Sequence, residues 1–267
     1  MRMFTDFVST SPSACAESCA DPKASKPVKM AADGGACIIC LDTSPPPIQS
    51  GCACRGDSGL AHIACRVRAA TSQQAQRGSD VWRQCQTCKQ EYTGAMRVGL
   101  AEAWRSRVAG QAAENTERLE AESNLAGSLL NQGKYAEAER IQREVLGARK
   151  RVLGAEHPNT LTSASNLALS LCNQDKYAEA ERIQREVHEV QTRVLGAEHP
   201  NTLASAGILA MSLLHQGKCA DAERIQREVH EVDKRVHGAE HPSTLRSANN
   251  LSMALSSQGK YADAELI

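Results

Sequence analysis

Eight side chains that bind soft metal ions stand in four closely spaced groups in the first third of the chain. They are seven cysteines and one histidine, in the order Cys37, Cys40, Cys52, Cys54, His62, Cys65, Cys85 and Cys88. Thiolate sulfur and imidazole nitrogen are the preferred ligands of Zn²⁺, and a structural zinc site takes four of them in a tetrahedron. The set is therefore enough for two zinc ions with no open coordination position, which predicts a structural rather than a catalytic metal centre.

Each group supplies only two ligands, so each metal ion must join two groups that are distant in sequence. Two-residue spacers, as in Cys37-x2-Cys40 and Cys85-x2-Cys88, let both thiolates reach one metal from a tight turn. Residues 36–93 hold few large apolar side chains and cannot bury enough surface to fold unless bound metal stabilises them. We therefore predict a zinc-stabilised finger over this range.

The overall composition narrows the class of protein. The chain has 267 residues, with 31 Lys and Arg against 31 Asp and Glu, so its formal net charge is zero. Nucleic acid is not an expected partner, because binding it needs a positive surface. No apolar run approaches the roughly 18 residues that span a bilayer, and the first residues lack the apolar stretch of a signal peptide. These features predict a soluble, intracellular (cytoplasmic) protein, in which clustered thiols favour metal over disulfides. Residues 1–35 are rich in Ser, Ala, Lys and Pro and are predicted to be a disordered tail.

The second half of the chain is repetitive. The segment QGKYAEAERIQREV at 132–145 returns in nearly the same form at 174–187 and at 216–229, and begins once more at 258–267. A second marker, GAEHPNTL at 154–161, also recurs at steps of 42 residues. A fixed period of this length indicates stacked units, each too small to bury its own apolar face.

Each repeat reads as a pair of helices. In the second copy, apolar residues recur at helical spacing in two runs: Leu161, Ala164, Leu167, Ala168 and Leu171, then Tyr177, Ala180, Ile183, Val187, Val190 and Val194. Gly196 is placed to end the second helix, because glycine tolerates the left-handed conformation that follows a helix. Pro200 falls in the first turn of the next helix, where its missing N–H has no partner to lose.

These repeats resemble the kinesin-light-chain type of tetratricopeptide repeat. The resemblance covers about three and a half copies over 115–267 and rests on Leu125, Ala126, Gly133, Tyr135, Ala138 and the HPxTL segments. It implies an all-α solenoid of helix pairs. From Val98 onward the composition shifts to Ala, Glu, Arg and Leu with helical periodicity, so a helical linker is expected at 94–114. A departure is found in the second helix, where the position usually filled by an aromatic residue holds Gln142, Gln184 and Gln226.

The resemblance also implies a peptide-binding surface on the first helix of each pair. In related repeats an asparagine there hydrogen-bonds the backbone of a bound peptide, and the matching residues are Asn124, Asn166 and Asn250. The third copy has Ile208 at this position. An unknown protein substrate or cargo peptide is therefore the expected partner of the repeats.

The eight-ligand order resembles the RING-CH (RING-variant, MARCH-like) zinc finger, which has Cys-x-Cys as its third and fourth ligands and a seven-residue gap before the histidine. RING-type fingers use a cross-brace, in which alternate groups share a metal. The resemblance thus implies one zinc on Cys37, Cys40, His62 and Cys65, and the other on Cys52, Cys54, Cys85 and Cys88.

The function that this resemblance implies is that of a ubiquitin ligase, which orients a ubiquitin-conjugating enzyme and its thioester-linked ubiquitin. Ile39 matches the family's apolar contact with the conjugating enzyme, and Lys89 matches the cation that bridges enzyme and ubiquitin. Ala69 and Gln86 depart from the tryptophan and proline found at their positions. No residue of this chain is expected to act as a catalytic group.

Two other functions are consistent with the sequence. The finger could be an inert zinc module in a protein-interaction scaffold, which Ala69 favours. It could also be a PHD finger, a reader of histone tails with the same order of ligand types. PHD fingers have longer third-to-fourth spacers, shorter gaps before the histidine and an aromatic residue two before the seventh ligand, whereas Trp82 is three before it. The residues therefore favour the RING-CH type.

Overall fold

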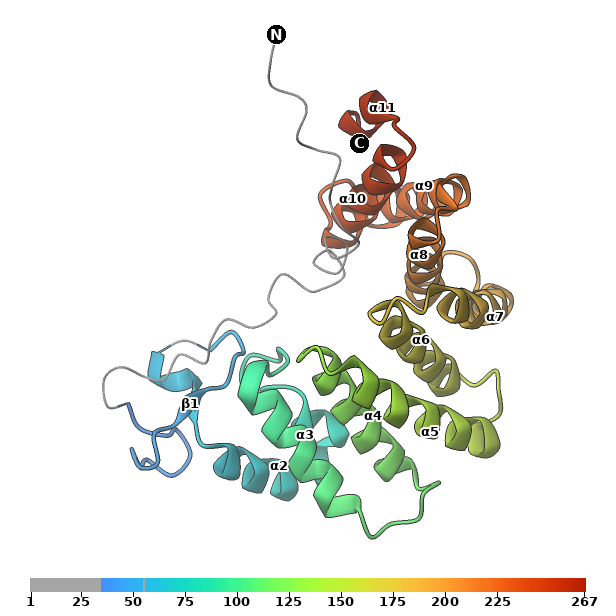
Figure 1. The fold of residues 1–267 in the computed structure, drawn as a ribbon. Helices are drawn as coiled ribbons and strands as arrows, with labels where there is room; N and C mark the ends of the chain where they lie inside the picture. The colour runs from blue at the N-terminus through green and yellow to red at the C-terminus, as the bar shows by residue number, and fades with distance from the viewer. Residues whose placement is uncertain (1–34, 55) are drawn as a thin grey trace. The chain divides into compact units, whose positions relative to one another are not determined.

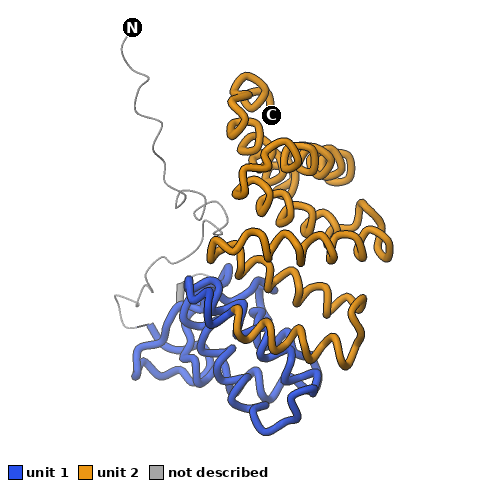
Figure 2. Tube along the Cα trace, turned by 45° about the vertical axis from the view of Figure 1, so that its right-hand side comes forward, with its two compact units in different colours: residues 1–138 blue, residues 139–267 orange. Residues whose placement is uncertain are grey.

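The computed structural model describes residues 35–54 and 56–267 (Figure 1). The chain divides into two compact units, residues 1–138 and 139–267 (Figure 2). Residues 1–34 of the predicted disordered tail lie outside the described residues.

The first unit contains a small two-stranded sheet and three long helices. Strand β1 (Ile48–Gln49) pairs antiparallel with β2 (Leu60–Ala61), after the short 3-10 helix η2 (Gly56–Gly59). Helix α2 (Ile63–Arg77) follows the sheet, and a second 3-10 helix, η3, occupies Ser79–Trp82. Helices α3 (Gly94–Val108) and α4 (Thr116–Leu130) complete the described part of this unit before α5 begins.

Helix α3 lies at the centre of this unit's core. The predicted helical linker at 94–114 does contain a helix, but its side chains Met96, Leu100 and Trp104 are almost fully buried. The ring of Trp104 stacks on that of Trp82 with 5.8 Å between the ring centroids and 4° between the planes. The apolar surface that residues 36–93 lack is thus supplied by the segment that follows them.

The repeats form successive helix pairs. The boundary between the two units falls inside α5 (Tyr135–Leu153), and the later helices follow in order: α6 (Pro158–Cys172), α7 (Tyr177–Leu195), α8 (Pro200–His215), α9 (Cys219–His237), α10 (Pro242–Ser256) and α11 (Tyr261–Glu265). The predicted apolar run of α6 is buried throughout. Helix α7 covers the whole of the second predicted run, whose last member, Val194, lies in the final turn and is 51% exposed.

A histidine caps the first helix of each pair in the second unit, α6, α8 and α10. The Nδ1 atom of His157 accepts the backbone N–H of Asn159 at 3.1 Å, and His199 and His241 do the same at 3.1 and 3.2 Å. The proline after each histidine occupies the first turn, as predicted for Pro200. Gly196 has φ +92° and ends α7, which confirms its predicted place.

Removing one of these caps is expected to destabilise the repeats without unfolding them. The His199→Ala variant should lose about 1 kcal/mol of unfolding free energy, because the N–H of Asn201 loses its acceptor. His199→Asn should retain most of the stability, because an asparagine side chain also caps helices well. Urea denaturation followed by circular dichroism measures both, and equal losses in the two variants would contradict the capping role.

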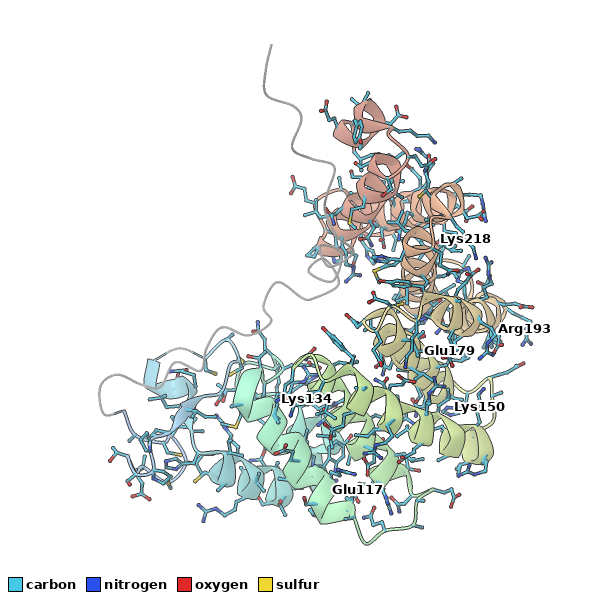
Figure 3. All side chains as sticks on the ribbon, in the orientation of Figure 1. Glu117, Lys134, Lys150, Glu179, Arg193 and Lys218 are labelled. Atoms are coloured by element: carbon cyan, nitrogen blue, oxygen red, sulfur yellow. The ribbon has the colours of Figure 1, made fainter. Side chains whose placement is uncertain are left out.

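A mostly buried carboxylate joins each repeat to the turn of the next. Glu139 in α5 accepts hydrogen bonds from Lys176 at 2.7 Å and Gln174 at 2.8 Å, both in the turn before α7. The equivalent contacts join Glu181 to Lys218 and Glu223 to Lys260 at 2.8 and 2.7 Å. Figure 3 shows Lys218 on the second unit. We call these three carboxylates, with their lysine partners, the repeat clamps.

The repeat clamps predict a loss of stability in acid. The Lys176 ammonium is the main cause that lowers the pKa of Glu139 from 4.5 to about 2, and Lys218 has the same effect on Glu181. Arg227 and Lys260 likewise lower the pKa of Glu223 to about 2. A lowered folded-state pKa contributes stability above the unfolded value, and that contribution is lost as pH falls from 4.5 towards 2.

The measurement is the urea midpoint of wild type and Glu139→Gln at pH 7 and pH 3. At pH 7 the variant should be less stable by about 1–3 kcal/mol, because charge-assisted hydrogen bonds are lost. The difference between the two proteins should shrink at pH 3. Glu144→Gln is the matched control, because Glu144 forms only an exposed pair with Arg140. A difference that is constant with pH would contradict the clamp.

Among the described residues, no helix is both long and apolar enough to cross a membrane.

Candidate metal centres

The structure brings the eight predicted ligands together in two groups of four. One group is Cys37, Cys40, His62 and Cys65, and the other is Cys52, Cys54, Cys85 and Cys88. Within each group the ligand atoms all lie within 4.8 Å of one another. Each group joins two sequence segments that are separated by one segment of the other group. This is the crossed pairing that the RING-CH resemblance implies.

The two Cys-x2-Cys segments fold into the same backbone turn. The N–H of Leu41 donates to the Cys37 carbonyl at 2.8 Å, and the N–H of Lys89 donates to the Cys85 carbonyl at 2.8 Å. Leu41 and Lys89 also share an unusual positive φ, +66° and +60°. Such a conformation is uncommon outside glycine, so its occurrence at equivalent places in both turns points to one shared requirement. The shared requirement is that each turn brings its two cysteine sulfur atoms close together.

His62 is oriented as a metal ligand through its Nδ1 atom. Its Nε2 lies 2.5 Å from the Pro45 carbonyl oxygen, which can only accept, so Nε2 carries the proton. In the neutral imidazole Nδ1 is then the unprotonated nitrogen, and it faces the sulfur atoms of Cys40 at 3.3 Å and Cys65 at 3.7 Å. Metal-bound histidines usually donate their other N–H to a carbonyl or carboxylate in this way.

The second group is held by a close approach between two loops. Thr93 donates its hydroxyl to the Gly51 carbonyl at 3.0 Å, which fixes the chain just before Cys52. Gly51 has φ +71°, and a Cβ atom at this position would collide with the Thr93 side chain. Only glycine fits here, so the sequence GC before the Cys-x-Cys segment is a local structural requirement.

The close sulfur atoms of the second group shift one another's pKa values. Burial, together with the neighbouring thiols, raises the pKa of Cys52 to about 12. The backbone N–H of Gln90 lowers the pKa of Cys88 to about 6. Adjacent thiolates repel one another, so all four sulfurs lose their protons together only around a positive ion.

Zn²⁺ fits both groups by ligand type and spacing. Sulfur and imidazole ligands favour Zn²⁺ over Mg²⁺ or Ca²⁺, which prefer oxygen. A zinc–sulfur bond of about 2.3 Å places tetrahedral sulfur atoms about 3.8 Å apart. The Cys54 and Cys85 sulfur atoms are 3.8 Å apart.

Apolar side chains in and beside the Cys37-x2-Cys40 turn are exposed. Ile38, Ile39 and Leu41 are 38%, 39% and 76% exposed. Of these three side chains, only Ile39 was predicted from the sequence as a contact. Leu41 could have been found from its place directly after the second cysteine, where the turn directs it outward.

The predicted contact Lys89 is exposed, and it shares a partner with a second cation. Lys89 Nζ and Arg77 Nη1 lie 3.5 and 3.2 Å from the Gln86 side-chain oxygen. The Gln86 amide donates to the Gln84 carbonyl, which aims its oxygen at the two cations. Gln86, noted above only as a departure from proline, is therefore placed to hold both. Ala69, the other departure, is half-buried on α2.

The predicted peptide-binding asparagines fall in both units. Asn124 is on α4 in the first unit and is 8% exposed. Asn166 on α6 and Asn250 on α10 belong to the second unit and are half-buried. Ile208, on α8 between them, packs against the α6 and α7 core.

The exposed surface of α6, α8 and α10, termed here the A-helix face, is almost free of charge. These three helices together contain no Asp, Glu or Lys, and their one arginine is Arg246. Arg246 is exposed and forms no ion pair with any residue that the structure describes. Leu169, Met211 and Met253 are half-buried on this face and give it an apolar character.

Comparison with protein families identifies the repeats. Tetratricopeptide-repeat models match residues 120–159, 161–229 and 203–267, which together make up more than half of the chain. No curated protein matches the chain in sequence.

Solved structures show the same fold. Nearly identical TPR-like repeats of a putative kinesin light chain from Podosopora anserina align with a TM-score of 0.57 and 24% identity, covering 76% of this chain and 90% of that one. BtubC (BKLC) from P. vanneervenii aligns with a TM-score of 0.54 and 14% identity, covering 76% and 74%. The predicted all-helical solenoid of helix pairs is thereby confirmed. The chain belongs to the tetratricopeptide-repeat family.

Proposed function

We propose that this protein is a RING-type ubiquitin ligase, in which the finger recruits a ubiquitin-conjugating enzyme and the repeats hold a protein substrate. Tetratricopeptide repeats indicate a protein-interaction scaffold, so the proposal adds an activity to that role. The observation that carries it is the crossed pairing of the eight ligands beside an exposed apolar surface.

The docking surface for the conjugating enzyme is formed by Ile38, Ile39 and Leu41. Three apolar side chains exposed on a single turn are unusual on a finger that has few large apolar residues. Bound zinc would hold this turn in place through Cys37 and Cys40. A partner with its own apolar side chains would gain by covering the three residues.

The chemistry takes place on the bound enzyme. A substrate amine attacks the thioester carbonyl that links ubiquitin to the conjugating enzyme, a C–N bond forms, and the enzyme thiol leaves. The residues of this chain contact the enzyme rather than the reacting atoms, so their contribution is orientation. Lys89, held beside Arg77 by Gln86, would supply positive charge to the bound complex.

The A-helix face would hold the substrate. An uncharged, partly apolar surface with one unpaired cation fits an extended segment that carries apolar side chains and one carboxylate. Asn166 and Asn250 would hydrogen-bond its backbone.

Selection from a random peptide library displayed on phage tests this surface. Wild type should enrich peptides with an acidic residue, and Arg246→Glu should bind them roughly ten-fold more weakly, because a charge-assisted hydrogen bond is lost. Arg224→Glu on α9 is the control, since Arg224 is already paired with Glu228. Identical selections by wild type and Arg246→Glu would contradict this role.

The activity itself is tested by autoubiquitination across a broad panel of conjugating enzymes. Wild type with zinc should build ubiquitin chains, and Cys37→Ser should build none. Absence of chains with every enzyme, from protein that contains zinc, would reject the ligase and leave an interaction scaffold. Specific binding to histone-tail peptides instead would indicate a PHD-type reader.

A further inference from the structure

The finger and the first helix of the repeats share one hydrophobic core. The buried cluster of the first unit includes the ligands Cys52 and Cys85, the stacked pair Trp82 and Trp104, and Ala121 of α4. Trp82 lies three residues before Cys85, in the turn that leads to the second ligand group. The position of its ring is thus tied to that group.

A polar network joins the same elements. Glu117, in the first turn of α4, accepts hydrogen bonds from Gln111 at 2.9 Å, from Gln74 of α2 at 2.7 Å and from Trp104 at 3.5 Å. Gln74 also accepts the Trp82 indole N–H at 2.9 Å. These donors, Gln111 first, hold the pKa of Glu117 below its usual value. Figure 3 shows Glu117 on the first unit.

We propose that metal binding by the finger controls the order of α4, the first helix of the repeats. The proposal rests on the metal-binding part of the proposed function and does not depend on ubiquitin transfer. Its basis is that α2, η3, α3 and α4 pack as one unit around the ligands.

Helix α4 depends on this packing for its order. It has 15 residues, and isolated helices of that length are marginal in water. Its buried residues include Leu119, Ala121 and Leu125. Its contact with α3 is reinforced by the ion pair between Arg105 and Glu122 at 3.1 Å. Without bound metal, the segment that carries Trp82 would lose its fixed position. Helix α3 would then lose the surface on which it packs.

Hydrogen exchange of the full chain, zinc-loaded and after treatment with a chelator, tests the proposal. Amides of 116–130 should exchange at least about ten-fold faster without zinc, because local opening becomes easier. Amides of α9, at 219–237 in the second unit, should be unchanged. Trp82 and Trp104 are the chain's two tryptophans, so a red shift of its fluorescence on zinc removal reports directly on this core.

A second variant separates the network from the metal. Gln74→Ala keeps all eight ligands and should retain its zinc, but its α4 amides should exchange faster than those of wild type. Gln76→Ala is the matched control on the exposed side of α2.

Each outcome bears on the proposal. Zinc-loaded protein whose α4 amides are indifferent to the chelator overturns the inference and leaves the ligase proposal standing. If the protein takes up no zinc, both the inference about α4 and the ligase proposal are overturned. A response of α4 in protein that builds no ubiquitin chains supports the inference and rejects the ligase.

Discussion

Replacing Cys85 with serine is expected to abolish the folded structure of the finger. Cys85 is fully buried and belongs to the second ligand group. Structural zinc contributes on the order of 10–16 kcal/mol in finger peptides, which matches or exceeds the entire stability of a typical domain. The loss of one ligand therefore removes more free energy than the small core can replace.

The expected result is a variant with less zinc than the two ions proposed for wild type, and with tryptophan fluorescence close to that of unfolded protein. Metal content is measured by mass spectrometry of the purified chain. Cys219→Ser is the control, because Cys219 lies on α9 outside both ligand groups, and it should keep both ions. A Cys85→Ser protein with full zinc content and native fluorescence would contradict the metal assignment.

The proposed ligase activity predicts that replacing Ile39 with alanine abolishes most ubiquitin transfer while the finger stays folded. Its side chain is 39% exposed, so truncation removes little of the core. A central apolar contact typically contributes more than about 1 kcal/mol at an interface, and misplacement of a reacting group can reduce its rate about a hundred-fold. Single-turnover discharge of ubiquitin from a charged conjugating enzyme measures this step.

The same experiment with Leu41→Ala should give a comparable loss, since Leu41 is the most exposed of the three side chains. Val194→Ala is the control, because this valine is similarly exposed but lies in the second unit. Both finger variants should keep the zinc content of wild type. Discharge at the wild-type rate in both would show that the enzyme docks elsewhere or not at all.

Local patterns in the sequence were sufficient for the helix pairs. The 42-residue period and the 3.6-residue spacing placed α6 and α7, and Gly196 and Pro200 mark where one helix ends and the next begins. These signals are read within one repeat and do not depend on distant contacts. The period therefore predicts the solenoid without knowledge of its packing.

Contacts that join distant segments were harder to predict from the sequence. The burial of α3 depends on the stack of Trp104 on Trp82, 22 residues away, and no local pattern specifies that partner. The histidine caps were missed for another reason. Histidine is not among the common capping residues, so His157 reads as a turn residue until its Nδ1 is seen to accept an N–H.

The glutamines that stand in place of aromatic residues are buried. Gln142 accepts the hydroxyl of Ser170 at 2.5 Å, whereas Gln184 is fully buried and has no hydrogen-bond partner in the described residues. The sequence shows that three repeats differ from the family at one place, but only the packing shows that they differ from one another.

The repeat clamps have a consequence for how such a chain changes over generations. Every clamp takes its glutamate from one copy and its lysine from the next, as Glu181 and Lys218 do, and the two sides are the same at each junction. Any copy can therefore follow any other with its ion pair intact. Unequal recombination between copies would add or remove whole 42-residue steps without creating a mismatched junction. Array length can therefore change by whole repeats while the same clamp is kept at each junction.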